Sequence, residues 1–193
     1  MLSLKRTLAG LVMSVATATA MAQATPDALI KQVSTEVIDT IKGDKTLQSG
    51  DMSKIISLVD AKVMPHVNFQ RMTASAVGRY WRQATPEQQQ KLQAEFKTLL
   101  VRTYSGALGQ VKKDQLIQIK PMRSGAGDTE VVVKTEVRGS NDPIQLDYRL
   151  EKSDAGWKIY DVNVLGVWLV ENYKNSFAQE ISAGGIDGLI AKM

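Results

Sequence analysis

The chain has 193 residues, no cysteine, one histidine and a formal net charge of +4. The lack of cysteine excludes disulfide frameworks, iron–sulfur clusters and thiol nucleophiles, and the single histidine, His66, excludes a metal site built from several imidazoles. Apolar residues make up 44% of the chain and charged residues 23%, which is typical of a globular domain and not of a disordered or fibrous chain.

The first 22 residues have the pattern of an export signal. A basic pair, Lys5 and Arg6, precedes an apolar run that ends at the A-x-A cleavage site Ala20-Met21-Ala22. This run is shorter than a bilayer-spanning helix requires, although an uncleaved anchor or a core helix is the alternative. We therefore expect residues 1–22 to be a cleaved signal peptide and residues 23–193 to form a single domain. Without the leader the domain is only weakly basic, so we expect no nucleic-acid partner.

Helical periodicity marks the N-terminal half of the exported chain. Thr25, Asp51, Asn68 and Thr85 are capping residue types, and each stands just before apolar positions that repeat every three to four residues. Thr85 is also followed by a glutamine at the third helical position, which is the spacing of a capping box. The expected helices cover residues 26–43, 52–64, 69–77 and 86–108.

After residue 109 the hydrophobic period changes from helical spacing to strict alternation, which predicts strands. The four expected strands cover residues 116–120, 129–138, 144–152 and 157–165. Turn-rich links of hairpin length join them, and two helical stretches, about 167–182 and 186–192, close the chain. This order predicts an α+β fold in which a twisted antiparallel four-strand sheet is wrapped with helices.

Motifs for a nucleophile elbow, a zinc site, a phosphate loop and a calcium loop are missing from the sequence, so we expect no enzyme, no metal and no catalytic residues. Strict alternation places Asp161 on the same strand face as Trp157 and Ile159, where it is either buried and hydrogen-bonded or functional. The alternative function is therefore an exported enzyme. It would use Asp161 as acid or base, with Tyr148 or Tyr160, on a small apolar substrate.

Basic residues gather between positions 61 and 102, and they include Arg79 and Arg82. Such a cluster is either an ordinary solvated helix face or a positive rim. A positive rim would attract an anionic head group, a membrane or a partner protein.

Two separated blocks of sequence carry a family resemblance. The first is GRYWRQATPEQ at Gly78–Gln88, and the second is GWKIYDV at Gly156–Val162. The residues that extend these blocks are Phe96, Leu100–Tyr104, Gly166, Val167, Leu169, Val170, Tyr173 and Phe177. Together they resemble the MlaC, or toluene-tolerance, family of periplasmic phospholipid-binding proteins over essentially the whole exported chain. The chain departs from the family pattern at Trp168, where a small serine is usual.

The resemblance implies an NTF2-like cone with an apolar cavity for acyl chains, and no cofactor apart from the bound phospholipid. It further implies a periplasmic carrier that shuttles glycerophospholipids between two membrane assemblies and so maintains outer-membrane lipid asymmetry. The two assemblies implied are an outer-membrane lipoprotein complex and an inner-membrane ABC transporter with its periplasmic substrate-binding subunit. We expect the carrier to be a monomer.

Periodicity and resemblance together select the residues expected to line the cavity. From the fourth helix they are Leu92, Phe96, Leu99, Leu100, Tyr104 and Leu108. From the strands they are Val131, Val133, Val137, Leu146, Tyr148, Leu150, Tyr160, Val162 and Val164. The head group would stay at the mouth near Arg79 and Arg82. Without the family, such a stripe is usually a filled core, and the chain would then be a periplasmic adaptor that binds other proteins and purifies free of lipid.

Overall fold

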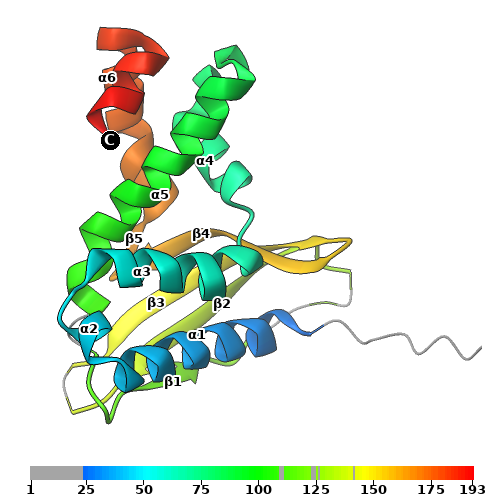
Figure 1. Cartoon of the computed structure of the whole chain (residues 1–193). Helices are drawn as coiled ribbons and strands as arrows, with labels where there is room; N and C mark the ends of the chain where they lie inside the picture. Colours follow the sequence, from blue (N-terminus) through cyan, green and yellow to red (C-terminus); the bar gives the residue numbers. More distant parts are fainter. Residues whose placement is uncertain (1–23, 109–110, 123–124, 126, 141) are drawn as a thin grey trace, which may run out of the picture.

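A five-stranded antiparallel sheet and a group of helices that rises from it make up the computed structural model of the chain (Figure 1). The structure describes residues 24–108, 111–122, 125, 127–140 and 142–193; the expected signal peptide lies outside this range. Within the described residues, no helix combines the length and the hydrophobicity needed to span a bilayer.

Helices and helical turns form the N-terminal part of the described chain. They are α1 (Pro26–Gly43), α2 (Lys45–Gln48), α3 (Met52–Leu58), the π-helical turn η1 (Val59–Val63) and the 3-10 turn η2 (Met64–His66). The Asp51 side chain accepts a hydrogen bond from the Lys54 amide at 3.1 Å, so the predicted cap of α3 is confirmed. The α-helix ends at Leu58, earlier than predicted, because the chain continues as the wider π-helical turn η1 and then as the tighter 3-10 turn η2.

The next helices confirm the predicted caps and breaks. In α4 (Phe69–Val77) the Asn68 Oδ1 atom accepts from the Arg71 amide at 3.0 Å. The helix ends at Gly78, whose φ of 65° favours glycine. After the 3-10 turn η3 (Gly78–Gln83), α5 (Pro86–Leu108) begins with a reciprocal capping box. In this box Thr85 N donates to Gln88 Oε1 at 3.0 Å, and Gln88 N donates to Thr85 Oγ1 at 3.2 Å.

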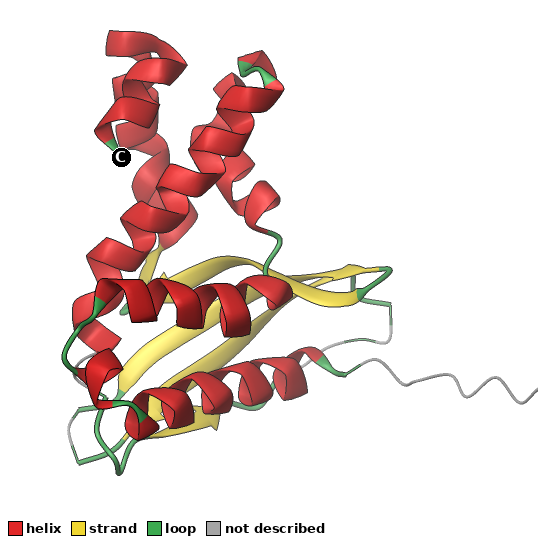
Figure 2. Cartoon of the chain, viewed as in Figure 1, coloured by secondary structure: helices red, strands yellow, loops and turns green. Residues whose placement is uncertain are grey.

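The strands, drawn yellow in Figure 2, form an open sheet. Their order is that of a meander, β1-β2-β3-β4-β5. Its strands are β1 (Leu116–Ile119), β2 (Glu130–Arg138), β3 (Ile144–Ser153), β4 (Gly156–Val164) and β5 (Val167–Trp168). The predicted count of four strands is wrong, because the chain turns back after β4 and pairs two more residues before the last helix begins. That helix, α6 (Leu169–Lys192), breaks at Gly185, where φ is 70°. The likeness to an NTF2-like cone stays a prediction.

A β-bulge in β4 reverses the predicted facing of Ile159 and Tyr160 relative to the residues that follow them. Arg149 pairs with Asp161, whereas the next residue of β3, Leu150, pairs with Ile159, so Tyr160 is an extra residue in β4. Ile159 consequently shares the inner, apolar face of the sheet with Val162. The prediction that Asp161 faces the same way as Ile159 is wrong, because strict alternation fails at the bulge.

Three apolar clusters stabilise these layers. The helical cluster joins α4, α5 and α6, with Phe69, Phe96 and Phe177 among its buried members. The sheet cluster packs Leu29, Ile30 and Val33 of α1 against Val133, Leu150 and Ile159 on the inner face of the sheet. The third cluster joins the end of α1 to α2, α3 and α5, with Ile41, Leu47, Ile55, Leu58 and Val101 as its buried members.

Candidate functional site

The burial of the apolar side chains of α5 decreases along the length of the helix. Leu92 and Phe96 are completely buried in the helical cluster. The Phe96 ring lies 5.1 Å from the Phe177 ring and meets it edge to face. One and two turns further on, Leu99 and Leu100 are only half-buried at the margin of this cluster, and Tyr104 is half-buried outside all three clusters. The second half of the stripe therefore faces inward without being fully covered.

The inner face of the sheet shows the same change. Val133 and Leu150 are completely buried in the sheet cluster, whereas Leu146 and Val164 are half-buried and lie in none of the clusters. Val162 is also half-buried and packs against both the helical and the sheet cluster. Val162 therefore marks the place where the two apolar surfaces meet.

We give the name junction region to the half-buried apolar side chains that border these two surfaces. They are Leu99, Leu100 and Tyr104 of α5 and Leu146, Tyr148, Val162 and Val164 of the sheet. Protein interiors are normally packed to high density, so inward-facing aliphatic groups that stay partly exposed leave apolar surface for another molecule to cover. The arrangement suits a flexible apolar ligand.

The side chains that define the junction region carry no charge at neutral pH. Its polar atoms include the Tyr148 hydroxyl, which is hydrogen-bonded to Ser34 and Thr135. Burial raises the pKa of this hydroxyl above its ordinary value, so it stays protonated at neutral pH. A neutral lining avoids the large cost of leaving an unpaired charge against hydrocarbon.

The remaining residues predicted to line a cavity lie elsewhere. Val137 of β2 is buried, and Val131 borders the sheet cluster. The side chain of Leu108 lies outside the described residues. The prediction for Tyr160 is wrong, because the bulge turns it toward the opposite, polar face of the sheet. The strand and helix patterns do not single out Tyr173, which packs against the helical cluster. Its spacing of four residues from Phe177 in a predicted helix places both on one face.

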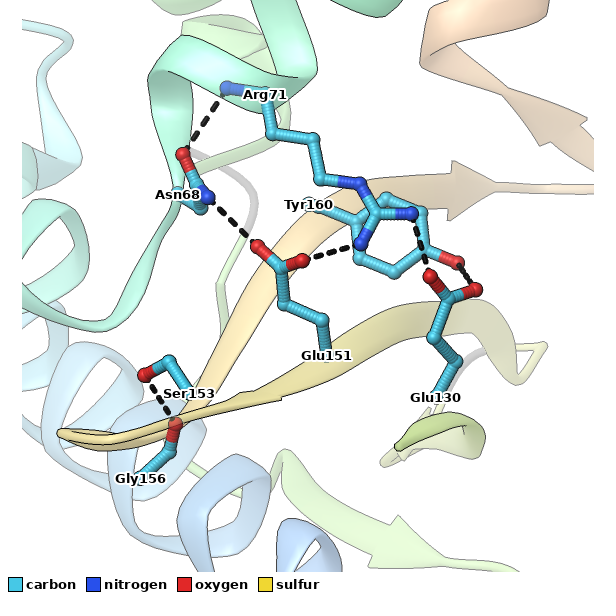
Figure 3. Close-up of polar contacts among 7 residues, drawn as sticks. All are labelled: Asn68, Arg71, Glu130, Glu151, Ser153, Gly156 and Tyr160. Atoms are coloured by element: carbon cyan, nitrogen blue, oxygen red, sulfur yellow. Dashed lines mark hydrogen bonds and ion pairs between the residues drawn. The ribbon is translucent and has the colours of Figure 1, made fainter. Parts of the chain in front are cut away.

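On the polar face, Arg71 fastens α4 to three strands (Figure 3). Its guanidinium donates to Glu130 Oε1 at 2.7 Å, forms an ion pair with Glu151 and lies 3.6 Å from the centre of the Tyr160 ring. The Tyr160 hydroxyl donates to Glu130 Oε2 at 3.0 Å, and Asn68 Nδ2 donates to Glu151 Oε1 at 2.6 Å. The Arg71 hydrogen bond lowers the pKa of Glu130, so this carboxylate is ionised at neutral pH.

Asp161 performs a structural task at the start of α6. Its carboxylate accepts from the Val162 amide at 2.9 Å, from the Val170 amide at 3.1 Å and from Arg149 at 3.0 Å. Val170 lies in the first turn of α6, so Asp161 satisfies a free amide there and interacts favourably with the helix dipole. Burial raises the pKa of Asp161, while these donors act in the opposite direction.

The acid–base group expected for an enzyme is not assembled. Asp161 is bonded to Arg149 and backbone amides, Tyr160 is bonded to Glu130, and Tyr148 lies on the other face of the sheet. Arg149 is further fixed by the Trp168 ring, whose centre lies 3.9 Å from the guanidinium carbon. Within the described residues, acidic and histidine side chains form no group that could hold a metal ion.

Arg79 and Arg82 lie at the far tip of the helices. Both are exposed in η3, which joins α4 to α5 at the end away from the sheet (Figure 1). Arg79 donates to the Tyr80 hydroxyl at 2.9 Å beside an open hollow of about 490 Å³ that Ser182 of α6 also lines. The structure does not bring these cations together with the junction region.

Comparisons with known proteins agree on one family. The family model described as MlaC protein matches residues 31–193. The intermembrane phospholipid transport system binding protein MlaC of Haemophilus influenzae is 25% identical over 181 residues, which cover 92% of this chain and 84% of that protein. The toluene tolerance protein ttg2D of Pseudomonas putida is 27% identical over 169 residues, which cover 86% of this chain and 78% of that protein.

A solved structure is similar in both sequence and fold. It is the phospholipid-binding protein from Ralstonia solanacearum, determined in complex with a phospholipid. It shares 50% sequence identity with this chain and superposes with a TM-score of 0.84. The match covers 87% of this chain and 94% of that one.

Proposed function

The chain belongs to the MlaC family, and we propose that it carries a phospholipid whose acyl chains occupy the junction region. The observation that carries this proposal is the pairing of two facts. The similar Ralstonia protein was solved with a phospholipid, and this chain leaves apolar side chains beside its clusters only partly covered.

The physics of acyl chains explains why such a surface is useful. Two chains of about 15 methylenes each cost on the order of 24 kcal/mol to expose to water. A carrier must replace the bilayer with apolar protein surface of nearly equal free energy, because tighter binding would prevent release. Half-buried aliphatic groups such as Leu99 and Leu146 supply this surface without a charged partner. The polar head group stays in water outside it.

We extend the proposal to the route of the lipid. Export by the leader at residues 1–22 would place the domain in the periplasm, where it would act as a monomeric shuttle. Its partners would be an outer-membrane lipoprotein complex and an inner-membrane ABC transporter with a periplasmic substrate-binding subunit. The name of the Haemophilus relative, which refers to intermembrane phospholipid transport, supports this route.

Native and denaturing mass spectrometry test the proposal. The mature protein is purified from a periplasmic fraction without detergent and weighed under both conditions. We expect one diacyl glycerophospholipid per chain in the native spectrum, released on denaturation and identifiable by its fragments. A lipid-free mass that persists after incubation with phospholipid vesicles would contradict the carrier and favour the protein-binding adaptor.

A further inference from the structure

The turn between β4 and β5 exposes an apolar side chain in an unfavourable backbone conformation. Leu165 has a φ of 52° and is the only non-glycine residue with positive φ in the described part of the chain. Glycine, asparagine and aspartate tolerate this conformation far better than leucine does. The turn is held by two hydrogen bonds, in which the Leu165 amide donates to the Gln145 carbonyl at 3.1 Å and the Gly166 amide donates to Asn163 Oδ1 at 2.8 Å. Leucine is thus kept at a strained position where it is 67% exposed.

This turn adjoins a row of side chains that runs across the inner face of the sheet. Val167 of β5 pairs with Val164, Val164 pairs with Leu146, and Leu146 pairs with Thr135. Directly paired residues point to the same face, so these four form one continuous row. Burial increases along it: Val167 is 48% exposed, Val164 and Leu146 are half-buried, and Thr135 is completely buried. The row leads from solvent at the β5 edge into the junction region.

Other exposed apolar residues of the sheet have no such continuation. Leu116, at the opposite edge, is also 67% exposed, but it pairs with Arg138. Val132 is 40% exposed and pairs with Arg149 on the polar face. Only the β5 edge therefore joins exposed apolar side chains to the junction region in the described part of the sheet.

We propose that the β4–β5 turn, through Leu165 and Val167, is the entrance by which the acyl chains of a phospholipid pass between a bilayer and the junction region. This role rests on the proposed function and adds a place and a direction of entry to it. An acyl chain that leaves a bilayer exposes methylenes to water at about 0.8 kcal/mol each. The exposed side chains of Leu165 and Val167 cover these methylenes in the transition state, before the acyl chain reaches the interior. These two side chains therefore change the rates of uptake and release equally and leave the equilibrium occupancy unchanged.

Matched substitutions test the entrance. Leu165→Asn replaces the leucine with a polar residue that tolerates positive φ, and Val167→Thr keeps the shape of the side chain. Leu116→Asn and Val132→Thr make the same chemical changes at similarly exposed positions away from the row. Each mature variant, stripped of lipid and checked by thermal unfolding, is mixed with phosphatidylethanolamine–phosphatidylglycerol vesicles. The vesicles contain a phospholipid with a fluorescent acyl chain and a quencher. The rate of dequenching and the final amount of bound lipid are recorded.

We expect Leu165→Asn to slow uptake by about fivefold, with a smaller effect of Val167→Thr, normal final occupancy and wild-type rates for both control variants. Wild-type uptake rates for Leu165→Asn, or equal slowing by Leu116→Asn, would contradict the proposed entrance at the β4–β5 turn. Either result would leave the proposed carrier function standing. A lowered final occupancy at a normal rate would also contradict the entrance, because Leu165 would then belong to the bound state. A wild-type protein that takes up no lipid would overturn the carrier itself.

Discussion

The two halves of the α5 stripe differ in what covers them. In the first half, Leu92 and Phe96 are completely buried by α4 and α6, with aromatic rings on more than one side of Phe96. In the second half, Leu99, Leu100 and Tyr104 face inward but remain half-buried. The helix carries one continuous apolar pattern, yet its first half is a structural core and its second half borders the junction region. An apolar stripe thus reports which way a helix faces, and the neighbouring elements decide whether the space beside it is filled.

The largest expected effect comes from placing a charge in the second half. We expect Leu100→Glu to abolish lipid retention, because the carboxylate would have no partner among apolar side chains. Mass spectrometry of the purified variant measures the bound lipid. Ala94→Glu, on the exposed side of the same helix, is the control and should keep its lipid. A folded Leu100→Glu protein with a full complement of lipid would show that the junction region is wrongly placed.

Truncation in the first half should act on stability instead. We expect Phe96→Ala to lower the free energy of unfolding by about 3–5 kcal/mol, because it opens a cavity in the filled helical cluster. Leu100→Ala should cost less, since its side chain is already partly uncovered. Unfolding in urea on lipid-free protein measures both values. Equal losses of unfolding free energy in the two variants would show that both halves of the α5 stripe are packed equally well.

The Arg71 network on the polar face should contribute less than the helical cluster. We expect Arg71→Met to cost about 1–3 kcal/mol, because it removes charge-assisted hydrogen bonds and the contact with the Tyr160 ring. Arg138→Met, which removes an exposed ion pair with Glu136, is the control and should cost little. If the two variants lost the same stability, Arg71 would have no special role in fastening α4.

The same network predicts a pH dependence. Because Arg71 lowers the pKa of Glu130 below its ordinary value of 4.5, the unfolded chain binds more protons than the folded one at acidic pH. The stabilisation is fully present above pH 4.5 and is lost as the pH falls through the folded pKa of Glu130. Unfolding curves should therefore show a weaker loss at acidic pH in Arg71→Met than in the wild type. An identical loss in both proteins would contradict this coupling.

The smallest effect is expected at the tip of the helices. The double variant Arg79→Glu and Arg82→Glu should leave stability unchanged, because both side chains are exposed. If these cations attract an anionic membrane or partner, the variant should exchange lipid more slowly with anionic vesicles at low salt and normally at high salt. Unchanged exchange at low salt would assign both residues to an ordinary solvated surface.

Local signals predict most of the fold because each acts within a few residues. The reciprocal bonds of Thr85 and Gln88, the Asn68 cap and the stop at Gly78 all form as expected. The bulge at Tyr160 depends on pairing with β3, and the sequence of β4 gives no sign of it. The prediction that Asp161 shares a face with Ile159 is therefore wrong. The strand β5 has two residues and is too short to show a period.

The site is less predictable than the fold. Periodicity correctly places Leu146 and Val164 on the inner face, but burial depends on elements distant in sequence. Leu92 and Leu99 therefore look equivalent in the sequence, although α4 and α6 cover only the first completely. The Arg71 network joins residues about 60 to 80 positions apart, and no local pattern reports such a contact.

Photo-crosslinking tests most directly whether acyl chains occupy the junction region. A phospholipid with a diazirine near the end of one acyl chain is loaded into the mature protein and irradiated, and the labelled residues are identified by peptide mass spectrometry. We predict labels on the α5 segment Leu99–Tyr104 and on β3 and β4 around Leu146 and Val162, and none around Arg79. Labels confined to the hollow beside Arg79, or to the exposed face of α1, would contradict the account.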